Sequence, residues 1–197
     1  MKTGSNMEGK LLIFCAPSGS GKSTIVQHLM KGMPELAFSI SATSRNPRQG
    51  ELDGREYHFI SPQLFREKIK KDEFIEWEEV YQDQYYGTLK SEVDRIWSKG
   101  QHALFDIDVL GGQNLKKEYG DKALSIFVKS PSLAILEERL RSRGTDDEES
   151  LQKRLGKAEY ELSFAPKFDT ILVNDSLEKA IADAEALVQT FLSPETP

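Results

Sequence analysis

Ten residues near the start of the chain, 15–24, read CAPSGSGKST. Small residues lead into Gly21, Lys22 and Ser23, which fits the pattern G-x-x-x-x-G-K-[ST] except that Ala16 stands at its first position. In this pattern backbone N–H groups surround phosphate oxygens, the lysine reaches the β- and γ-phosphates, and the hydroxyl binds Mg²⁺. We therefore expect a nucleoside triphosphate to bind the glycine-rich loop, residues 16–24: Ala16, Pro17, Ser18, Gly19, Ser20, Gly21, Lys22, Ser23 and Thr24.

The missing first glycine is compatible with this prediction. Glycine is required only where φ is positive or where the phosphate approaches the backbone closely, and Gly19 and Gly21 remain for those tasks. A positive φ at Ala16 would contradict this interpretation. The alternative is a turn that merely joins a strand to a helix.

Strands and helices alternate along most of the chain. Expected strands cover 10–16, 36–41, 74–80, 102–109, 123–130 and 169–175, and expected helices cover 22–33, 89–100, 132–144, 149–164 and 176–192, with another beginning at Ser61-Pro62. This alternation predicts an α/β fold with a parallel sheet, right-handed crossovers and helices on both faces. Short strands and turns cluster in 42–90, which indicates a small subdomain inserted beside the sheet.

Length and composition narrow the class of protein. The 197 residues are enough for one domain with a full core. A net charge of −6 argues against general nucleic-acid binding. The single cysteine, Cys15, excludes an intramolecular disulfide and, within an apolar run, is expected to be a buried hydrophobe. No apolar run approaches the roughly 18 residues that a membrane span needs, and MKTGSNMEGK is not a signal peptide, so we expect a cytoplasmic protein without a membrane or nucleic-acid partner.

Two further segments carry basic, aromatic and acidic side chains: SISATSRNPRQGELDGREYHFI (39–60) and FIEWEEVYQDQYYGT (74–88). Arg45 and Arg48 are three residues apart with Pro47 between them, and their guanidinium forks suit a phosphate monoester, although solvated loop charges are the alternative. Considered without the rest of the segment, Glu76 is expected to be an exposed carboxylate on a strand, and Tyr85 is expected to be a packing residue.

Taken together, these segments resemble the guanylate kinase family. The family's S-x-[TS]-T-R-x-P-R-x-G-E segment reads here as Ser41, Thr43, Ser44, Arg45, Pro47, Arg48, Gly50 and Glu51. Its Y-x-F, F-I-E and Y-Y-G-[ST] segments read as Tyr57–Phe59, Phe74–Glu76 and Tyr85–Thr88. The resemblance covers roughly residues 10–190, and it implies a P-loop kinase that transfers a phosphoryl group from ATP to GMP with Mg²⁺.

The resemblance also implies a division of labour along the chain. It implies a kinase core (10–41, 89–138 and 165–192), a GMP-binding subdomain (42–88) and a helical lid (139–164). GMP would be bound by Ser41, Arg45, Arg48, Tyr57, Glu76, Tyr86, Gly87, Thr88, Asp106 and Asp108. Guanine offers N1–H and N2–H₂ as adjacent donors that a carboxylate such as Glu76 can accept, whereas adenine has an acceptor at N1.

Acidic residues at the end of ALFDIDV are typical of a strand that positions Mg²⁺ beside the loop. We expect Asp106 and Ser23 to hold the metal, while which of Asp106 and Asp108 faces the metal stays open. The resemblance implies that Lys22, Arg45 and the lid arginines Arg139, Arg143 and Arg154 are catalytic and that Asn174 lies near the adenine. Glu137, Glu138 and Arg141 fit solvated charge pairs better.

Two other functions remain as alternatives. One is a guanylate-kinase-like binding module without catalysis, which the intact Lys22, Ser23 and arginines disfavour. The other is a kinase of a different small phosphorylated acceptor, which the combination of Glu76, Tyr86 and Thr88 disfavours. The expected partners are ATP and GMP, and the sequence leaves open whether the protein is a monomer or a homodimer.

Overall fold

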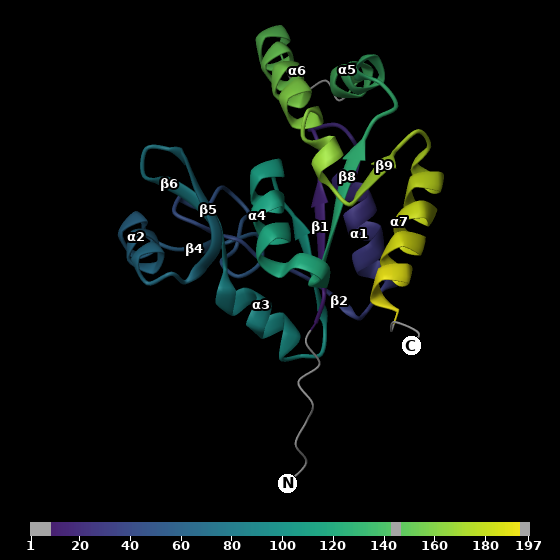
Figure 1. Cartoon of the computed structure of the whole chain (residues 1–197). Helices are drawn as coiled ribbons and strands as arrows, with labels where there is room; N and C mark the ends of the chain where they lie inside the picture. Colours follow the sequence, from purple (N-terminus) through teal and green to yellow (C-terminus); the bar gives the residue numbers. More distant parts are fainter. Residues whose placement is uncertain (1–8, 143–146, 194–197) are drawn as a thin grey trace.

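A five-stranded parallel sheet forms the centre of the computed structural model, which describes residues 9–142 and 147–193 (Figure 1). The strands lie in the order β2-β7-β1-β8-β9. Their bounds are β1 Leu11–Cys15, β2 Leu36–Phe38, β7 His102–Asp106, β8 Ala123–Lys129 and β9 Thr170–Val173. All four pairings are parallel, so the predicted α/β fold is confirmed.

The central strand β1 is buried on both faces, as expected of a parallel sheet covered by helices. Leu12 and Phe14 pack under α1 (Lys22–Gly32) and α7 (Leu177–Leu192). Cys15 points to the other face, under α3 (Lys90–Trp97) and α4 (Val109–Tyr119). Burial raises the pKa of the Cys15 thiol far above its ordinary value, so this cysteine is a packing residue, as predicted.

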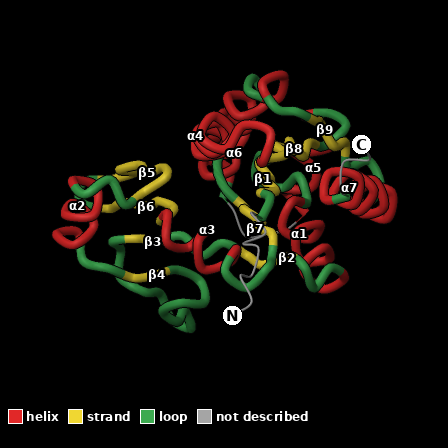
Figure 2. The backbone as a smooth tube through the Cα atoms, turned by 60° about the horizontal axis from the view of Figure 1, so that its bottom comes forward, coloured by secondary structure: helices red, strands yellow, loops and turns green. Residues whose placement is uncertain are grey.

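A second sheet stands beside the first one (Figure 2). It has the order β4-β3-β6-β5, with bounds β3 Ala42–Thr43, β4 His58–Phe59, β5 Phe74–Tyr81 and β6 Gln84–Leu89. Helix α2 (Pro62–Lys70) begins at Ser61-Pro62 as predicted, is capped by the Ser61 hydroxyl, and closes a small core of its own. There the Phe65 ring stacks on Phe74 at 4.2 Å and on Tyr85 at 5.2 Å between ring centroids.

Helices α5 (Leu133–Ser142) and α6 (Glu148–Leu162) form a pair beyond the carboxyl end of β8 (Figure 1). They pack through Leu136, Leu140, Leu151 and Ala158, and Asp147 caps the start of α6. Two short 3₁₀ turns, η1 (Gly120–Lys122) and η2 (Ala165–Lys167), precede β8 and β9. Within the described ranges, no helix is long and apolar enough to cross a membrane.

Helix α4 corrects a prediction. The strand expected over 102–109 ends at Asp106, and Asp108 is the N-cap of α4: its Oδ1 accepts the N–H groups of Leu110 at 2.8 Å and Gly111 at 3.0 Å. Glycines in the first turn lower the helix propensity of this segment, so the sequence pattern did not predict the helix. The packing requires them, because a Cβ on Gly111 would lie 2.6 Å from Ile107 Cδ1 and one on Gly112 2.5 Å from Cys15 Sγ.

The strand expected over 36–41 is also shorter than predicted. It ends at Phe38, and the next residues leave the central sheet to enter β3. The buried Glu92 carboxylate accepts the N–H of Ile40 at 2.9 Å during this crossing. The backbone therefore finds its hydrogen bond in a side chain of α3 rather than in a neighbouring strand.

Candidate active site

The glycine-rich loop connects β1 to α1, the strand-to-helix context that its motif requires. Gly19 has φ +92° and Gly21 has φ +88°, the left-handed region that favours glycine. Among the described residues other than glycine, only Asp72 and Asp83 have positive φ. Ala16 therefore does not have the positive φ that would contradict its place in the loop.

Asn174, at the end of β9, holds this loop from behind. Its Nδ2 donates a hydrogen bond of 2.8 Å to the carbonyl of Ser20, and its side chain is buried. A Cβ on Gly21 would come within 2.2 Å of the same Nδ2. The second loop glycine is therefore needed for its conformation and for the close approach of Asn174.

A cavity of about 380 Å³ lies over the loop. Ser20 is buried and does not line it; the lining residues are Ala16, Pro17, Ser18, Gly19, Gly21, Lys22, Ser23, Thr24, Asp106, Ile107, Asp108 and Glu161. Lys22 forms an ion pair with Asp106 and donates to the carbonyl of Ile107 at 3.3 Å. The Ser23 hydroxyl lies 3.5 Å from Asp106 Oδ2. This cavity combines exposed backbone, a cation and oxygen ligands.

A second cavity of about 490 Å³ shares Asp106, Ile107 and Asp108 with the first. Strands β5 and β6 of the second sheet supply Glu76, Glu78, Val80, Tyr86 and Gly87. The segments flanking β3 supply Ser41, Arg45, Arg48 and Tyr57, and α6 supplies Lys157. Most residues expected to bind a second nucleotide therefore line one cavity that opens beside the loop. Thr88 is fully buried and pairs with Glu76 across β5 and β6 instead of lining the cavity.

Glu76 carries an unusual carboxyl group. Its side chain is buried, and this burial raises the pKa of Glu76 to about 7, with the nearby Asp108 carboxylate acting in the same direction. The Thr88 hydroxyl opposes this rise in pKa. A carboxyl group held ready to ionise near neutral pH, within a polar cavity, is a feature of functional sites.

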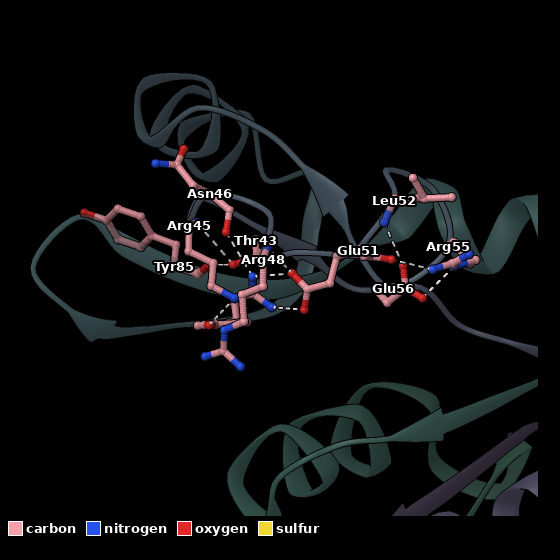
Figure 3. A network of polar contacts seen from close by, with 11 residues as sticks. Thr43, Arg45, Asn46, Arg48, Glu51, Leu52, Arg55, Glu56 and Tyr85 are labelled. Carbon is pink, nitrogen blue, oxygen red and sulfur yellow. Dashed lines mark hydrogen bonds and ion pairs between the residues drawn. The ribbon is translucent and has the colours of Figure 1, made fainter.

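The two arginines of the second cavity differ in their surroundings (Figure 3). Arg45 donates hydrogen bonds to both carboxylate oxygens of Glu51, from Nη1 to Oε2 at 2.6 Å and from Nη2 to Oε1 at 2.7 Å. Arg48 is exposed, and its guanidinium makes no hydrogen bond or ion pair within the described part of the chain. The expectation that both side chains offer an open fork is wrong for Arg45, whose fork already faces Glu51.

A model of the guanylate kinase family matches residues 8–191. The chain belongs to this family. Among similar proteins is the guanylate kinase of Bacteroides thetaiotaomicron, 55% identical over 189 residues, 96% of this chain and 93% of that protein. Another is the guanylate kinase of Porphyromonas gingivalis, 49% identical over 185 residues, 93% of this chain and 98% of that protein.

A solved structure shows the same fold at lower identity. The crystal structure of guanylate kinase from Anaplasma phagocytophilum superposes with a TM-score of 0.71 at 24% sequence identity, covering 95% of this chain and 88% of that one. The guanylate kinase family and its fold are thus shown by independent comparisons.

The arginines expected in a guanylate kinase lid occupy different places. Arg154 on α6 donates to the Ser18 hydroxyl of the loop at 3.2 Å. Arg139 on α5 donates to the carbonyls of Asn174 at 3.0 Å and Asp175 at 3.3 Å, behind the loop. Neither is among the described residues that line the first cavity, and Arg143 lies outside the described residues. Arg141 pairs with Glu137 at 2.9 Å and with Glu148, so it is the solvated charge pair that the sequence predicts.

Sequence reasoning missed two residues of α6. Glu161 is buried in the wall of the first cavity, and its burial raises the pKa of its carboxyl group. Lys157, one turn earlier, lines the second cavity and has its Nζ 3.8 Å from Glu161 Oε1. Helical spacing alone gave no signal for either, because both look like members of a solvated helix face.

Proposed function

We propose that this chain transfers the γ-phosphoryl group of ATP to GMP, giving ADP and GDP. The observation that carries the proposal is the meeting of two cavities at Asp106 and Asp108. One is built for a triphosphate around the glycine-rich loop. The other combines arginines with the buried carboxyl group of Glu76, and the curated relatives bear the name of this reaction.

The donor side follows from the loop. Its backbone N–H groups and the N-terminus of α1 would surround the phosphates of ATP. Lys22 would leave its ion pair with Asp106 to reach the β- and γ-phosphates. Asn174 is proposed near the adenine, where its hydrogen bond to Ser20 also fixes the loop.

On the acceptor side, ionised Glu76 would accept the N1–H and N2–H₂ donors of guanine. Ser41, Thr88 and Asp108 are proposed around the remaining edges of the base. The same carboxylate faces an acceptor atom in adenine, and a site that leaves buried groups unpaired can reject the wrong substrate by about 10⁴-fold. Arg45, Arg48, Tyr57 and Tyr86, with Gly87 beside them, would bind the monophosphate.

The reaction itself needs positioning more than proton transfer. A phosphate oxygen of GMP is already anionic, so no general base has to activate it. Lys22, Arg139, Arg143 and Arg154 are the residues that we propose neutralise charge around the transferred group, while Arg45 would orient the acceptor phosphate. The donation from Arg154 to Ser18 supports this role, since it already brings one guanidinium from α6 to the loop.

The residues beside the loop fit Mg²⁺. Ser23 and Asp106 present a hydroxyl and a carboxylate 3.5 Å apart, and oxygen ligands of this kind suit Mg²⁺, which is held largely by water and substrate phosphates. Asp106 is the better metal candidate because it contacts Lys22 and Ser23, whereas Asp108 is committed to capping α4. When bound, Mg²⁺ would neutralise phosphate charge.

Substrate closure is the remaining part of the proposal. We propose the division into a core (10–41, 89–138 and 165–192), a GMP-binding subdomain (42–88) and a lid (139–164). The separate small cores of the second sheet and of the α5–α6 pair support this division, because each can move as a unit. Closure would exclude water that could otherwise accept the phosphoryl group.

The experiment is direct observation of the product. The protein, ATP, Mg²⁺ and GMP are mixed, and ³¹P NMR follows the appearance of GDP. The proposal predicts ADP and GDP in equal amounts and no free phosphate. ADP accompanied by inorganic phosphate, or no reaction, would contradict it, and the latter would favour a binding module.

A further inference from the structure

The guanidinium of Arg45 is almost fully committed before any ligand arrives (Figure 3). Nε donates to the Tyr86 hydroxyl at 3.1 Å, Nη1 to the carbonyl of Asn46 at 3.0 Å and to Glu51 Oε2 at 2.6 Å, and Nη2 to Glu51 Oε1 at 2.7 Å. One N–H of Nη2 remains for a ligand. Arg45 is therefore a single directed donor rather than a fork.

The same guanidinium also lies over two aromatic rings. The Arg45 Cζ lies 5.1 Å from the centroid of the Tyr57 ring and 5.6 Å from that of Phe59. Only 10% of the side chain is exposed. A side chain confined by several hydrogen bonds and by two neighbouring rings has little conformational entropy left to lose when a ligand binds.

Glu51 also controls the backbone that carries Arg48. Its Oε2 accepts the N–H of Arg48 at 2.7 Å, and its own N–H donates to the carbonyl of Arg48 at 3.1 Å. Hydrogen bonds from Arg45 and from the Arg48 backbone lower the pKa of Glu51 to about 2. Glu51 is thus ionised throughout the physiological range and joins both arginines to one carboxylate.

We propose that Glu51 is a positioning residue for the acceptor phosphate, a role that rests on the proposed function of the second cavity. It pairs with and orients Arg45 as a fixed hydrogen-bond donor, and it closes the 45–51 turn so that Arg48 is presented as an exposed cation without an ion-pair partner among the described residues. The two arginines thereby have different roles in recognising the phosphate. Arg45 orients it through a directed hydrogen bond, and Arg48 attracts it through positive charge.

Removing the Glu51 carboxylate has two opposite effects on a phosphate ligand. It removes a negative charge that repels the phosphate, which favours binding. It also lets the Arg45 guanidinium move and removes one hydrogen bond that holds the turn, and this loss of order disfavours binding. The carboxylate is partly exposed, so solvent and salt screen its repulsion, whereas the loss of paired charge-assisted hydrogen bonds is not screened in this way. We therefore expect weaker binding.

The test compares Glu51→Gln with the wild-type protein by calorimetric titration of GMP and of guanosine, without ATP. Guanosine carries the base but no phosphate, so a defect confined to the phosphate contacts affects GMP alone. We expect the Kd for GMP to rise about tenfold, the size of one lost charge-assisted interaction, while the Kd for guanosine changes less than about twofold.

Glu56→Gln is the matched control. Glu56 sits in the same segment and accepts hydrogen bonds from Leu52 N–H at 2.8 Å and from Arg55 at 2.6 Å, without contact to Arg45. We expect it to leave both Kd values unchanged. If Glu51→Gln does not fold, Glu51→Asp, which retains the charge but withdraws it from the fork, is titrated instead and should weaken GMP binding in the same selective way.

The outcomes separate this inference from the function on which it rests. Equal or tighter GMP binding by Glu51→Gln, or equal loss of GMP and guanosine, would overturn the positioning role while leaving the proposed function standing. Failure of the wild-type protein to bind GMP would instead contradict the proposed function.

Discussion

The side-chain amide of Asn174 donates a hydrogen bond of 2.8 Å to the backbone carbonyl of Ser20, across 154 positions of sequence. This bond connects the end of β9 to the loop that we propose binds ATP. The Asn174 side chain is 4% exposed, so water cannot replace the donor if it is lost. The geometry of the loop depends on a residue that its motif does not contain.

Asn174→Asp should therefore loosen the loop and weaken ATP binding. The substitution exchanges a donor for a carboxylate facing a carbonyl, a buried mismatch that costs about 1–3 kcal/mol. Thermal unfolding should show a fall in Tm, and ATP titration should show a higher Kd. Asn114→Asp makes the same change at an exposed position of α4 and should do neither. Equal behaviour of the two variants would contradict the role of the Asn174 bond.

Lys22→Ala should abolish most turnover without unfolding the protein. Removal of one preorganised cation from a phosphoryl-transfer site typically lowers kcat by about 10²–10³-fold. Steady-state ADP release measures this loss, and circular dichroism checks the fold. Lys31→Ala, an exposed lysine on the same helix, is the control. A Lys22→Ala enzyme with near-normal kcat would remove this residue from the mechanism.

Glu76→Gln should change the choice of acceptor rather than the use of ATP. The amide presents a donor where guanine also presents donors, so kcat/KM for GMP should fall by at least about 10²-fold while the KM for ATP stays the same. Glu79→Gln, at an exposed position three residues along β5 that does not line the cavity, serves as the control. Unchanged discrimination between GMP and AMP would exclude Glu76 from base recognition.

Base recognition should also depend on pH. In the ligand-free protein the pKa of Glu76 is about 7, and only the ionised carboxylate can accept both guanine donors. Guanosine affinity should therefore rise as pH rises, by about tenfold between pH 6 and pH 8 for one linked proton. Guanosine avoids the titration of a phosphate group. The Glu76→Gln variant should show a flat profile, and a sloping one would assign the effect to another group.

The same carboxyl group affects stability with the opposite sign. Its pKa is raised above the ordinary value of 4.5, so the folded state holds the proton more tightly than the unfolded state. The contribution of Glu76 to stability is therefore present at low pH and is lost as pH rises through about 7. The Tm of Glu76→Gln minus that of the wild type should therefore increase as the pH rises from 5 to 8. A constant difference would contradict a raised pKa.

Much of the fold could be predicted from local patterns. The buried strand β1, the Ser61 and Ser176 caps and the apolar stripe of α7 carry their signals within a few residues. Helix α4 did not, because Gly111 and Gly112 lower helix propensity where close packing against Ile107 and Cys15 excludes any side chain. A tertiary requirement outweighed the local preference.

The candidate site divides in the same way. Motifs identified the loop, the two arginines and Glu76 because each motif is contiguous. The position of Glu161 in the cavity wall follows from how separate elements meet. The pairing of Glu51 with Arg45 follows from how the 45–51 turn folds. Residue spacing encodes neither. The sequence named the residue types of the site, and the fold determined which guanidinium was already occupied.

The choice of acceptor is the most direct test of GMP phosphorylation by this chain. The protein is supplied with ATP, Mg²⁺ and an equimolar mixture of GMP, AMP, CMP and UMP, and the diphosphates formed are separated and quantified. We expect GDP in large excess over CDP and UDP, and ADP in the same amount as GDP, because ATP leaves one ADP for each phosphoryl group transferred. The kcat/KM for GMP should be about 10⁴-fold above that for AMP. Each AMP phosphorylated yields two ADP, so ADP well above the sum of the other diphosphates without free phosphate, or ATP consumption without GDP, would contradict this expectation.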